Sequence, residues 1–441
     1  MRGIQTLNQL SKRCYAATRV APLTEPLVSP KPPLSVGRLA QGVQVSKLPS
    51  GLIVASLETY SPVSKIGVFV KAGSRYEPVG NLGVTHLLRL ASNLTTKGVS
   101  AFKISRGLEA LGSTLRLVHD SVIEYLISVT TAPEFRPWEV SELTSRVKID
   151  KALAEQCVQT SIFEKLHQAA YKNALSNSLY CPDYRVGKIT GDHVKFFANN
   201  YKSARMALVG LGVSHSALKQ VAEQYLDVHK GEGTPGDKAI YHGGELRVQN
   251  GDSLTHTLIA CEGAASGTAE ANAFSLLQQL LGAGPQVKRG SNVTSKLSQG
   301  IAKTTTQPFD ATAFNASYSD SGLFGLYTIA QADSTREVIK AAMAQVSAVA
   351  GGAISAEDLT RAKGQLKTEY LMVLESSDSL LEEIGIQALT SGAYSSPEVV
   401  AKDIDSVTSS DVINAAKKFV QSKKTMASRG HLVNTPFVDE L

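Results

Sequence analysis

The sequence has no apolar stretch long enough to cross a membrane, and it has few cysteines. Its longest apolar run, Met206 to Val213, has the length of a buried strand, whereas a spanning helix needs roughly 20 apolar residues. The four cysteines, Cys14, Cys157, Cys181 and Cys261, include no Cys-x-x-Cys pair and have no histidine at finger spacing. We therefore expect no transmembrane segment, no zinc finger and free thiols.

The sequence also lacks a concentrated basic surface. The chain of 441 residues has a net charge of +6, but about half of that excess comes from Arg2, Lys12 and Arg13 near its start. Elsewhere lysine and arginine alternate with acidic residues, and no basic stripe is interleaved with aromatics, which make up only 6%. This pattern argues against a nucleic-acid partner and is typical of a globular protein.

Acidic residues are missing from the start of the chain, where the first one is Glu25. Apolar residues recur there every three positions between arginines, lysines and polar residues, which predicts an amphipathic basic helix. This composition is typical of a mitochondrial presequence, with a disordered basic tail as the alternative. The bond between Tyr15 and Ala16 resembles a matrix cleavage site, so we assign residues 1–15 to the presequence and 16–40 to an N-terminal extension.

The remaining sequence contains the same order of predicted helices and strands twice. Near the end of each half, a capped helix leads through a basic turn into a strand, and Val194 and Tyr201 correspond to Val412 and Phe419, 218 residues later. Serine, threonine and aspartate precede both helices, as N-caps do.

The starts of the two halves also correspond, and they define the predicted fold. In order, the predicted elements are strands 43–48, 52–57 and 66–72 with a helix from about Gly83, and then strands 245–248 and 255–261 with a helix over 269–281. A stretch rich in glycine, proline and charge, residues 231–240, separates the halves as a linker. We predict an α+β chain of two homologous domains, 41–230 and 241–441, each with a mostly antiparallel sheet and packed helices.

The first half has fewer predicted elements than the repeat requires. The second half has a predicted helix over 294–301, strands over 311–318 and 323–330, and a helix over 335–349. The first half has a helix over 105–111, one strand over 114–118 and a further helix near Asp120. About one strand and its turn, roughly 15 to 20 residues, are missing, so either the first sheet has lost a strand or this sequence is a truncated version.

The specific motif lies in the loop from Ala72 to Glu77 and the helix after it, which reads His86-Leu87-Leu88-Arg89-Leu90. The loop and helix resemble the signature of the inverted-zincin metallopeptidases, which include the mitochondrial processing peptidase. In that family two histidines at i and i+4 share a zinc ion, and the glutamate between them acts as the general base. A further glutamate, roughly 75 residues downstream in the family, completes the site.

Only the first histidine of that motif remains, as His86. Arg89 stands in the glutamate position, where it cannot accept a proton, and Leu90 stands in the second-histidine position, where it offers no ligand. The downstream carboxylates Asp150, Glu155 and Glu164 cannot restore a site with one histidine. We expect no catalytic residue and no metal, with His86 buried on a helix face.

Two further features follow from the resemblance. The loop from Gly282 to Gly290 falls where the non-catalytic subunit of the processing peptidase has a longer glycine-rich loop, and here a helix C-cap is the favoured interpretation. The hairpin around Ser319 to Gly322 has aromatic residues on a strand that faces the chamber between subunits in the family. Phe324 and Tyr327 are therefore interface or cavity candidates, with core packing as the alternative.

The resemblance covers nearly the whole chain beyond residue 40, and segments such as 179–185, 265–274, 411–420 and 435–441 are similar to the core-subunit branch of this family, in ubiquinol–cytochrome c reductase (complex III). It implies a non-catalytic structural subunit of that homodimeric complex, peripheral on the matrix side of the mitochondrial inner membrane. The implied partners are core protein 1, cytochrome b, cytochrome c1 and the Rieske iron–sulfur protein. The haems and the iron–sulfur cluster would belong to those partners, with none bound by this chain. The alternative is the non-catalytic, presequence-binding subunit of a processing peptidase.

Overall fold

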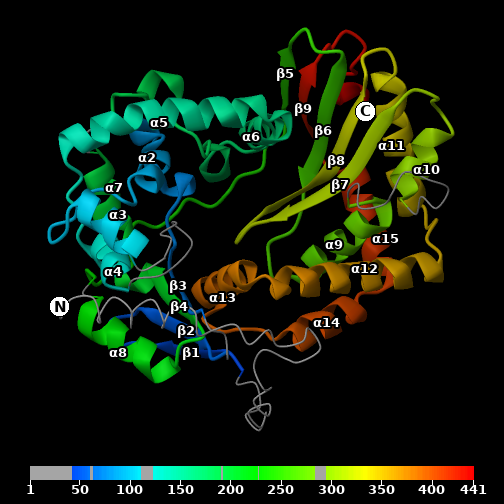
Figure 1. Cartoon of the computed structure of the whole chain (residues 1–441). Coiled ribbons are helices and arrows are strands. Elements are labelled where there is room, and N and C mark those ends of the chain that lie inside the picture. Colours follow the sequence, from blue (N-terminus) through cyan, green and yellow to red (C-terminus); the bar gives the residue numbers. More distant parts are fainter. Residues whose placement is uncertain (1–41, 60–62, 111–122, 190–191, 227, 284–294) are drawn as a thin grey trace, which may run out of the picture. The chain divides into compact units, whose positions relative to one another are not determined.

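The computed structural model of the chain (Figure 1) describes residues 42–59, 63–110, 123–189, 192–226, 228–283 and 295–441. The presequence positions Tyr15 and Ala16 and the predicted strand 114–118 lie outside these residues. Within the described ranges, helices and strands follow the predicted α+β plan, and none of the helices there is long and apolar enough to cross a bilayer.

The strands form two mixed sheets. They are β1 (Gln44–Lys47), β2 (Ile53–Leu57), β3 (Lys65–Val70), β4 (Met206–Leu211), β5 (Glu245–Gln249), β6 (Leu254–Glu262), β7 (Phe309–Ser317), β8 (Gly322–Gln331) and β9 (Thr425–Gly430). The first sheet has the order β1-β2-β4-β3 and the second has the order β5-β9-β6-β8-β7. Each sheet has one parallel pair, β2 with β4 and β5 with β9, and all its other pairs are antiparallel. The prediction of mostly antiparallel sheets is confirmed.

The two sheets repeat one topology around equivalent central strands. The strand β4 starts at Met206 and β9 starts at Thr425, 219 residues later, and each lies between a parallel and an antiparallel neighbour. By this equivalence β3 corresponds to β6. In the second sheet β6 pairs with β8, which pairs with β7, whereas no strand among the described residues pairs with the far edge of β3. The described part of the first sheet is therefore smaller, and the predicted strand 114–118 lies outside it.

The helices among the described residues are α2 (Val84–Leu90), α3 (Ala101–Ala110), α4 (Ile123–Thr131), α5 (Pro137–Gln156), α6 (Val158–Ala170), α7 (Asp192–Asn200), α8 (His215–Tyr225), α9 (Ala269–Leu281), α10 (Lys296–Ala302), α11 (Thr335–Ala350), α12 (Ala356–Glu375), α13 (Ser377–Ser391), α14 (Pro397–Ser406) and α15 (Ser409–Gln421). They include the predicted ones and six for which no span was predicted, α5, α6, α8, α12, α13 and α14. The helix α3 begins four residues before the predicted start at Ser105, because Ser100 accepts a hydrogen bond from the Lys103 N–H and caps it there. Thr408 and Asp411 form a complete capping box on α15.

Each half covers the sheet of the other half with one helix. The long helix α5 is followed by α6, and 219 residues later the equally long α12 is followed by α13. The helix α6 packs on β9, β6 and β5 of the second sheet, while α13 packs on β4, β3 and β2 of the first. Figure 1 shows this reciprocal exchange, with α6 reaching the second sheet and α13 reaching the first.

Apolar side chains fill both exchanged contacts. Ile162, Leu166 and Ala170 of α6 lie in one cluster with residues of β6, β8 and β9. Leu381 and Ile384 of α13 lie in another with residues of β2 and β4, and both side chains are fully buried. Burial of apolar surface is the main source of stability in a fold, so these two contacts join the halves into one unit.

We expect Gly385→Ala to destabilise the chain by about 1–3 kcal/mol, because a Cβ there would lie 2.6 Å from the Phe69 ring of β3. The matched control is Gly364→Ala on α12, where a Cβ meets nothing within 4 Å. That control should stabilise the helix by about 0.5–1 kcal/mol, because alanine loses less backbone entropy than glycine. Chemical unfolding of both variants measures the difference, and equal effects would contradict close packing of α13 on the first sheet.

Candidate functional site

The helix that carries the altered motif is fixed at its start by a buried carboxylate. Glu77 accepts hydrogen bonds from the backbone N–H of Gly83 at 2.8 Å and of Thr85 at 2.7 Å, and from the Thr85 hydroxyl at 2.6 Å. A carboxylate at this position satisfies free N–H groups and suits the positive end of the helix. Burial raises the pKa of Glu77, although these three hydrogen bonds oppose that shift. The loop thus places α2 rigidly.

Gly83 is required where α2 approaches the segment that contains Cys181. Its φ is 88°, in the left-handed region, and a Cβ would lie 2.8 Å from the Cys181 Cα. Only glycine permits this approach, which brings the backbone of Cys181 against the next turn of the helix.

His86 is buried, and both of its ring nitrogens are hydrogen-bonded. The Cys181 N–H donates to Nδ1 at 3.1 Å, so Nδ1 is the acceptor and Nε2 carries the proton. Nε2 in turn donates to the Asp150 carboxylate at 2.8 Å. Burial lowers the pKa of His86, although the hydrogen bond to Asp150 opposes that shift. The geometry therefore fits a neutral imidazole.

Arg89 and Leu90 make structural contacts at the positions where the peptidases have the general base and the second zinc ligand. The Arg89 guanidinium forms an ion pair with the same Asp150 carboxylate that binds His86, and it lies over the Tyr180 ring. The Leu90 side chain packs against the apolar cluster around Val84 and Leu87. The predicted burial of His86 is confirmed. Its hydrogen bond to Asp150 was not predicted from the sequence.

These residues do not fit the zinc ion that the motif binds in the peptidases. Zinc needs a free imidazole nitrogen on His86, yet one nitrogen accepts from the backbone and the other donates to Asp150. The permanent charge of Arg89 lies at the same carboxylate and would repel a cation. Among the described residues, no group of three or more histidine, cysteine, aspartate or glutamate side chains could hold a metal.

Of the three downstream carboxylates, only Asp150 reaches His86. Glu155 lies 3.9 Å from Lys151, and Glu164 accepts a 2.5 Å hydrogen bond from the Ser178 hydroxyl. The sequence carried no signal for the roles of Cys181 and Tyr180, because both lie in a loop distant along the chain.

A cavity of about 530 Å³ adjoins this site, between α5, α6 and the segment of residues 176–184. Its lining includes Tyr180 and Cys181 from the site, together with Lys151, Glu155 and Glu164. The walls therefore carry charges of both signs.

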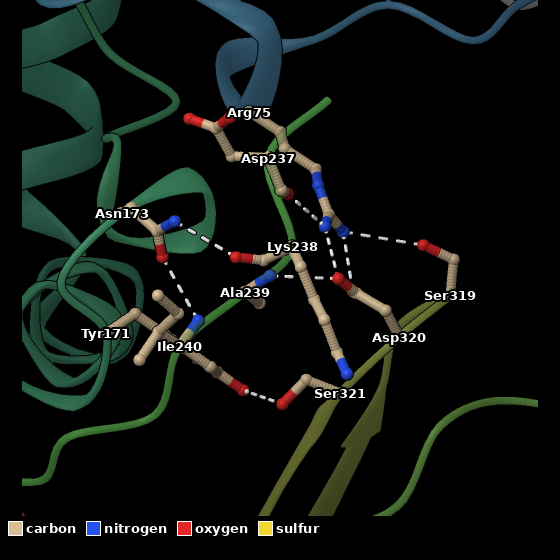
Figure 2. Close-up of polar contacts among 10 residues, drawn as sticks. All are labelled: Arg75, Tyr171, Asn173, Asp237, Lys238, Ala239, Ile240, Ser319, Asp320 and Ser321. Atoms are coloured by element: carbon tan, nitrogen blue, oxygen red, sulfur yellow. Dashed lines mark hydrogen bonds and ion pairs between the residues drawn. The ribbon is translucent and has the colours of Figure 1, made fainter. Parts of the chain in front are cut away.

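Arg75, in the loop that resembles the peptidase signature, binds the other half of the chain. Its guanidinium forms an ion pair with Asp320 in the β7–β8 turn and donates to the Asp237 carbonyl at 2.6 Å. Asp320 also accepts from the Ala239 N–H at 2.9 Å, and Arg75 holds the pKa of Asp320 below its ordinary value. Figure 2 shows residues 237–240 of the linker segment (residues 231–240) between these side chains of the two halves.

The linker segment also forms hydrogen bonds with a side chain of the first half, Asn173. Asn173 accepts from the Ile240 N–H at 3.0 Å and donates to the Lys238 carbonyl at 2.9 Å. Residues 231–240 form neither helix nor strand, yet side chains from both halves pair with their backbone (Figure 2). The segment acts as a fixed connection between the two sheets.

Phe324 and Tyr327, the interface or cavity candidates, lie within the packing of the second sheet. Phe324 is fully buried between Phe274 of α9 and Phe419 of α15. Tyr327 lies on the opposite face of β8, where it packs toward α6 and its hydroxyl bonds His256 at 2.8 Å. In this structure both side chains have the alternative role, core packing.

The glycine loop after α9 begins at Gly282, which follows the helix as its C-cap with φ of 127°. Its amide N–H donates to the Gln278 carbonyl at 2.8 Å, as expected for a C-cap. Gly290 and the remainder of the predicted loop lie outside the described residues.

Two family descriptions match the chain. "Insulinase (Peptidase family M16)" matches residues 53–120 and 114–183, and "Peptidase M16 inactive domain" matches residues 189–366.

Curated proteins match most of this chain. It is 58% identical over 418 residues to "Cytochrome b-c1 complex subunit 2, mitochondrial" of Homo sapiens, covering 91% of this chain and 92% of that protein. The Mus musculus protein of that name is 56% identical over 444 aligned positions, covering 97% of each. A probable mitochondrial-processing peptidase subunit alpha-2 of Arabidopsis thaliana is 30% identical over 436 residues, covering 94% of this chain and 87% of that protein.

Among solved structures, a chain in "Complex III2 from Candida albicans, Inz-5 bound" matches with a TM-score of 0.77. The match covers 90% of this chain and 98% of that chain at 16% identity, so it establishes a shared fold.

We expect His86→Gln to reduce the dependence of the unfolding free energy on pH. Because burial lowers the pKa of His86 below the ordinary 6.5, the folded chain binds fewer protons than the unfolded chain as the pH falls below that value. The stabilisation from neutral His86 is therefore complete above pH 6.5 and is lost progressively on acidification. Urea unfolding from about pH 7.5 to 5 should show a steeper decline for the wild type than for the variant. His431→Gln, at an exposed histidine, controls for the loss of one imidazole, and an unchanged slope in His86→Gln would contradict the assignment.

We expect Asp320→Asn to destabilise the chain by about 1–3 kcal/mol, because it removes a charged acceptor from Arg75 in a contact that is mostly shielded from water. Asp310→Asn, on the exposed edge of β7, is the matched control and should have little effect. Chemical unfolding in a double-mutant cycle with Arg75→Ala isolates the pair. Additive losses would show that the two side chains do not interact.

Proposed function

The chain belongs to the M16 peptidase family, as a relative of cytochrome b-c1 complex subunit 2, and from this we propose that it is a structural core subunit of mitochondrial ubiquinol–cytochrome c reductase, complex III. The observation that carries the proposal is the identity of more than half of all positions with subunit 2 along nearly the whole of both chains. Its task would be the assembly and stability of the complex, with no peptidase activity of its own.

The altered motif supports a non-catalytic role on chemical grounds. A peptidase of this family needs a general base beside a zinc-bound water, and here that position holds Arg89, which cannot take a proton. Asp150 accepts from both Arg89 and His86, so the polar groups of the site neutralise one another. Through their contacts with Asp150, His86 and Arg89 connect α2 to α5.

The exposed apolar residues on the two long helices support a role in an assembly. Ile149 and Leu153 of α5 are 61% and 59% exposed, on the face opposite the buried Val147. At the end of α12, Leu371, Met372 and Val373 are consecutive and 49%, 63% and 49% exposed. Consecutive exposed apolar residues are costly in a free protein, and they favour burial against a partner.

The proposal includes location and partners. We place the chain peripherally on the matrix side of the mitochondrial inner membrane, paired with core protein 1 beneath cytochrome b, cytochrome c1 and the Rieske iron–sulfur protein in a homodimeric complex. The haems and the iron–sulfur cluster would be bound by those partners. Cleavage of a presequence between Tyr15 and Ala16 would precede assembly.

The second candidate is a non-catalytic, presequence-binding subunit of a mitochondrial processing peptidase. It is favoured by the identity of about 30% with alpha subunits of that enzyme over most of the chain. That identity is about half of the identity with subunit 2, so this function ranks second.

Purification of the native protein separates the two candidates. We expect co-migration with cytochromes b and c1 on a native gel and in gel filtration. A heterodimer without haem that cleaves presequences would overturn the proposal and support the processing-peptidase candidate.

We expect Met372→Asp to reduce incorporation into the complex severalfold while leaving the fold of the chain intact, because it puts a charge on an exposed apolar face. Val433→Asp, at a residue that is 74% exposed and distant along the chain, is the matched control. Both are measured as the fraction of the chain that co-migrates with the complex, and thermal unfolding of each free chain checks the fold. Equal incorporation of both variants would show that this end of α12 is no contact.

A further inference from the structure

A groove of about 610 Å³ crosses the junction of the two halves, away from the altered motif. Its walls come from the ends of β1 and β3, from the linker segment and from the β7–β8 turn, so they include Arg75 and Asp320. Figure 2 shows one side of it, where the Lys238 side chain runs beside that turn.

Below this groove lies an arginine that has no acidic partner among the described residues. Arg205 is only 6% exposed, and its Nε donates to the Lys71 carbonyl at 2.9 Å while another guanidinium nitrogen donates to the Thr234 carbonyl. Its guanidinium lies over the Tyr76 ring, 4.2 Å from the centroid. Among the described residues, no carboxylate forms an ion pair with it, and burial lowers its pKa. Carbonyl dipoles and one aromatic ring therefore stabilise the buried positive charge of Arg205, and no described acidic residue neutralises it.

Three lysines extend this positive charge along the groove. Lys47, Lys71 and Lys238 are exposed lining residues, and no ion pair is formed by any of them with the part of the chain that the structure describes. The acidic lining residues are Glu232 and Asp320, and Asp320 already binds Arg75. The groove as a whole is therefore strongly cationic.

The arrangement of these charges indicates the kind of ligand. The lysines come from three separate segments, at the end of β1, after β3 and in the linker segment, so the charge is spread along the groove. A single phosphate or carboxylate group could contact only a part of it. A chain segment that carries several carboxylates in series could pair with all of it, and Arg205 would strengthen the field at its centre.

We propose that this groove binds an acidic segment of a partner polypeptide. The inference rests on the proposed function in one respect, because a subunit of an assembly has partners to bind. It goes beyond that function by assigning a surface and a partner chemistry that similarity to subunit 2 does not specify.

Binding of a fluorescein-labelled octaglutamate peptide to the full chain tests the proposal by fluorescence anisotropy. The groove variant is Lys47→Glu/Lys71→Glu/Lys238→Glu, and the matched control is Lys303→Glu/Lys340→Glu/Lys417→Glu, which makes the same charge change at exposed lysines of the second half. We expect the groove variant to weaken binding about tenfold or more and the control to weaken it about twofold or less. Binding should also weaken with added salt, which screens exposed charges.

Three results would overturn the proposal. Equal weakening in both variants would mean that the peptide binds to general surface charge. Tighter binding of tripolyphosphate than of the peptide, with displacement of the peptide, would assign the groove to a phosphate ligand. No measurable binding of the peptide by the folded wild-type chain would remove the site altogether. Thermal unfolding confirms the fold of each variant, and a triple Lys→Gln variant should give intermediate binding if charge is the cause.

The failure of this proposal and the failure of the proposed function are distinguishable. Loss of co-migration with cytochromes b and c1 would overturn the function and leave peptide binding by the groove unchanged. Conversely, a groove variant that assembles normally and binds the peptide as tightly as the wild type does would overturn only the proposal for the groove.

Discussion

The exchange of α6 and α13 between the two sheets is the contact on which the rest of the structure depends. Each sheet has one face covered by helices of its own half, and its other face would meet water without the helix from the opposite half. An exposed sheet face of that size is unfavourable, so neither half is complete alone. The Arg75–Asp320 ion pair and the fastened linker segment then add directional polar contacts to a junction that apolar burial has already formed.

The same exchange explains why the altered motif is still an ordered site. Asp150 lies on α5, directly before the helix that crosses to the second sheet, so its position is fixed by contacts in both halves. When a zinc ligand set is lost, a buried histidine and a nearby carboxylate need new partners, because unsatisfied buried polar groups are costly. Arg89 and the Cys181 N–H supply those partners here. In this chain the site connects α2 to α5 through the contacts of His86 and Arg89 with Asp150.

Much of the local structure was predictable, because it depends on neighbours in the sequence. The helix over 269–281 and the strand pair around Ser319 to Gly322 follow from periodicity and turn residues, and Arg89 and Leu90 alone decided against catalysis. The exchange of α6 and α13 was not predictable, because an apolar helix face in a sequence does not indicate which sheet it covers. Phe324 and Tyr327 show the same limit: β8 is buried on both faces, so alternation could not tell which packing each side chain has.

Among the described residues the first sheet has fewer strands than the second, and the position of the exchanged helix is compatible with that difference. The helix α13 packs on β2, β4 and β3, which are the strands equivalent to β5, β9 and β6 under α6. In the second sheet α6 also reaches β8 and β7, where Phe163 packs against Tyr327 and Phe314. The alignment with the Mus musculus relative has 444 positions, more than this chain has residues, so that relative contains residues absent here. In the first sheet α13 packs on β2, β4 and β3, and this contact needs no strand beyond β3, so a first half with fewer strands could still close against the other.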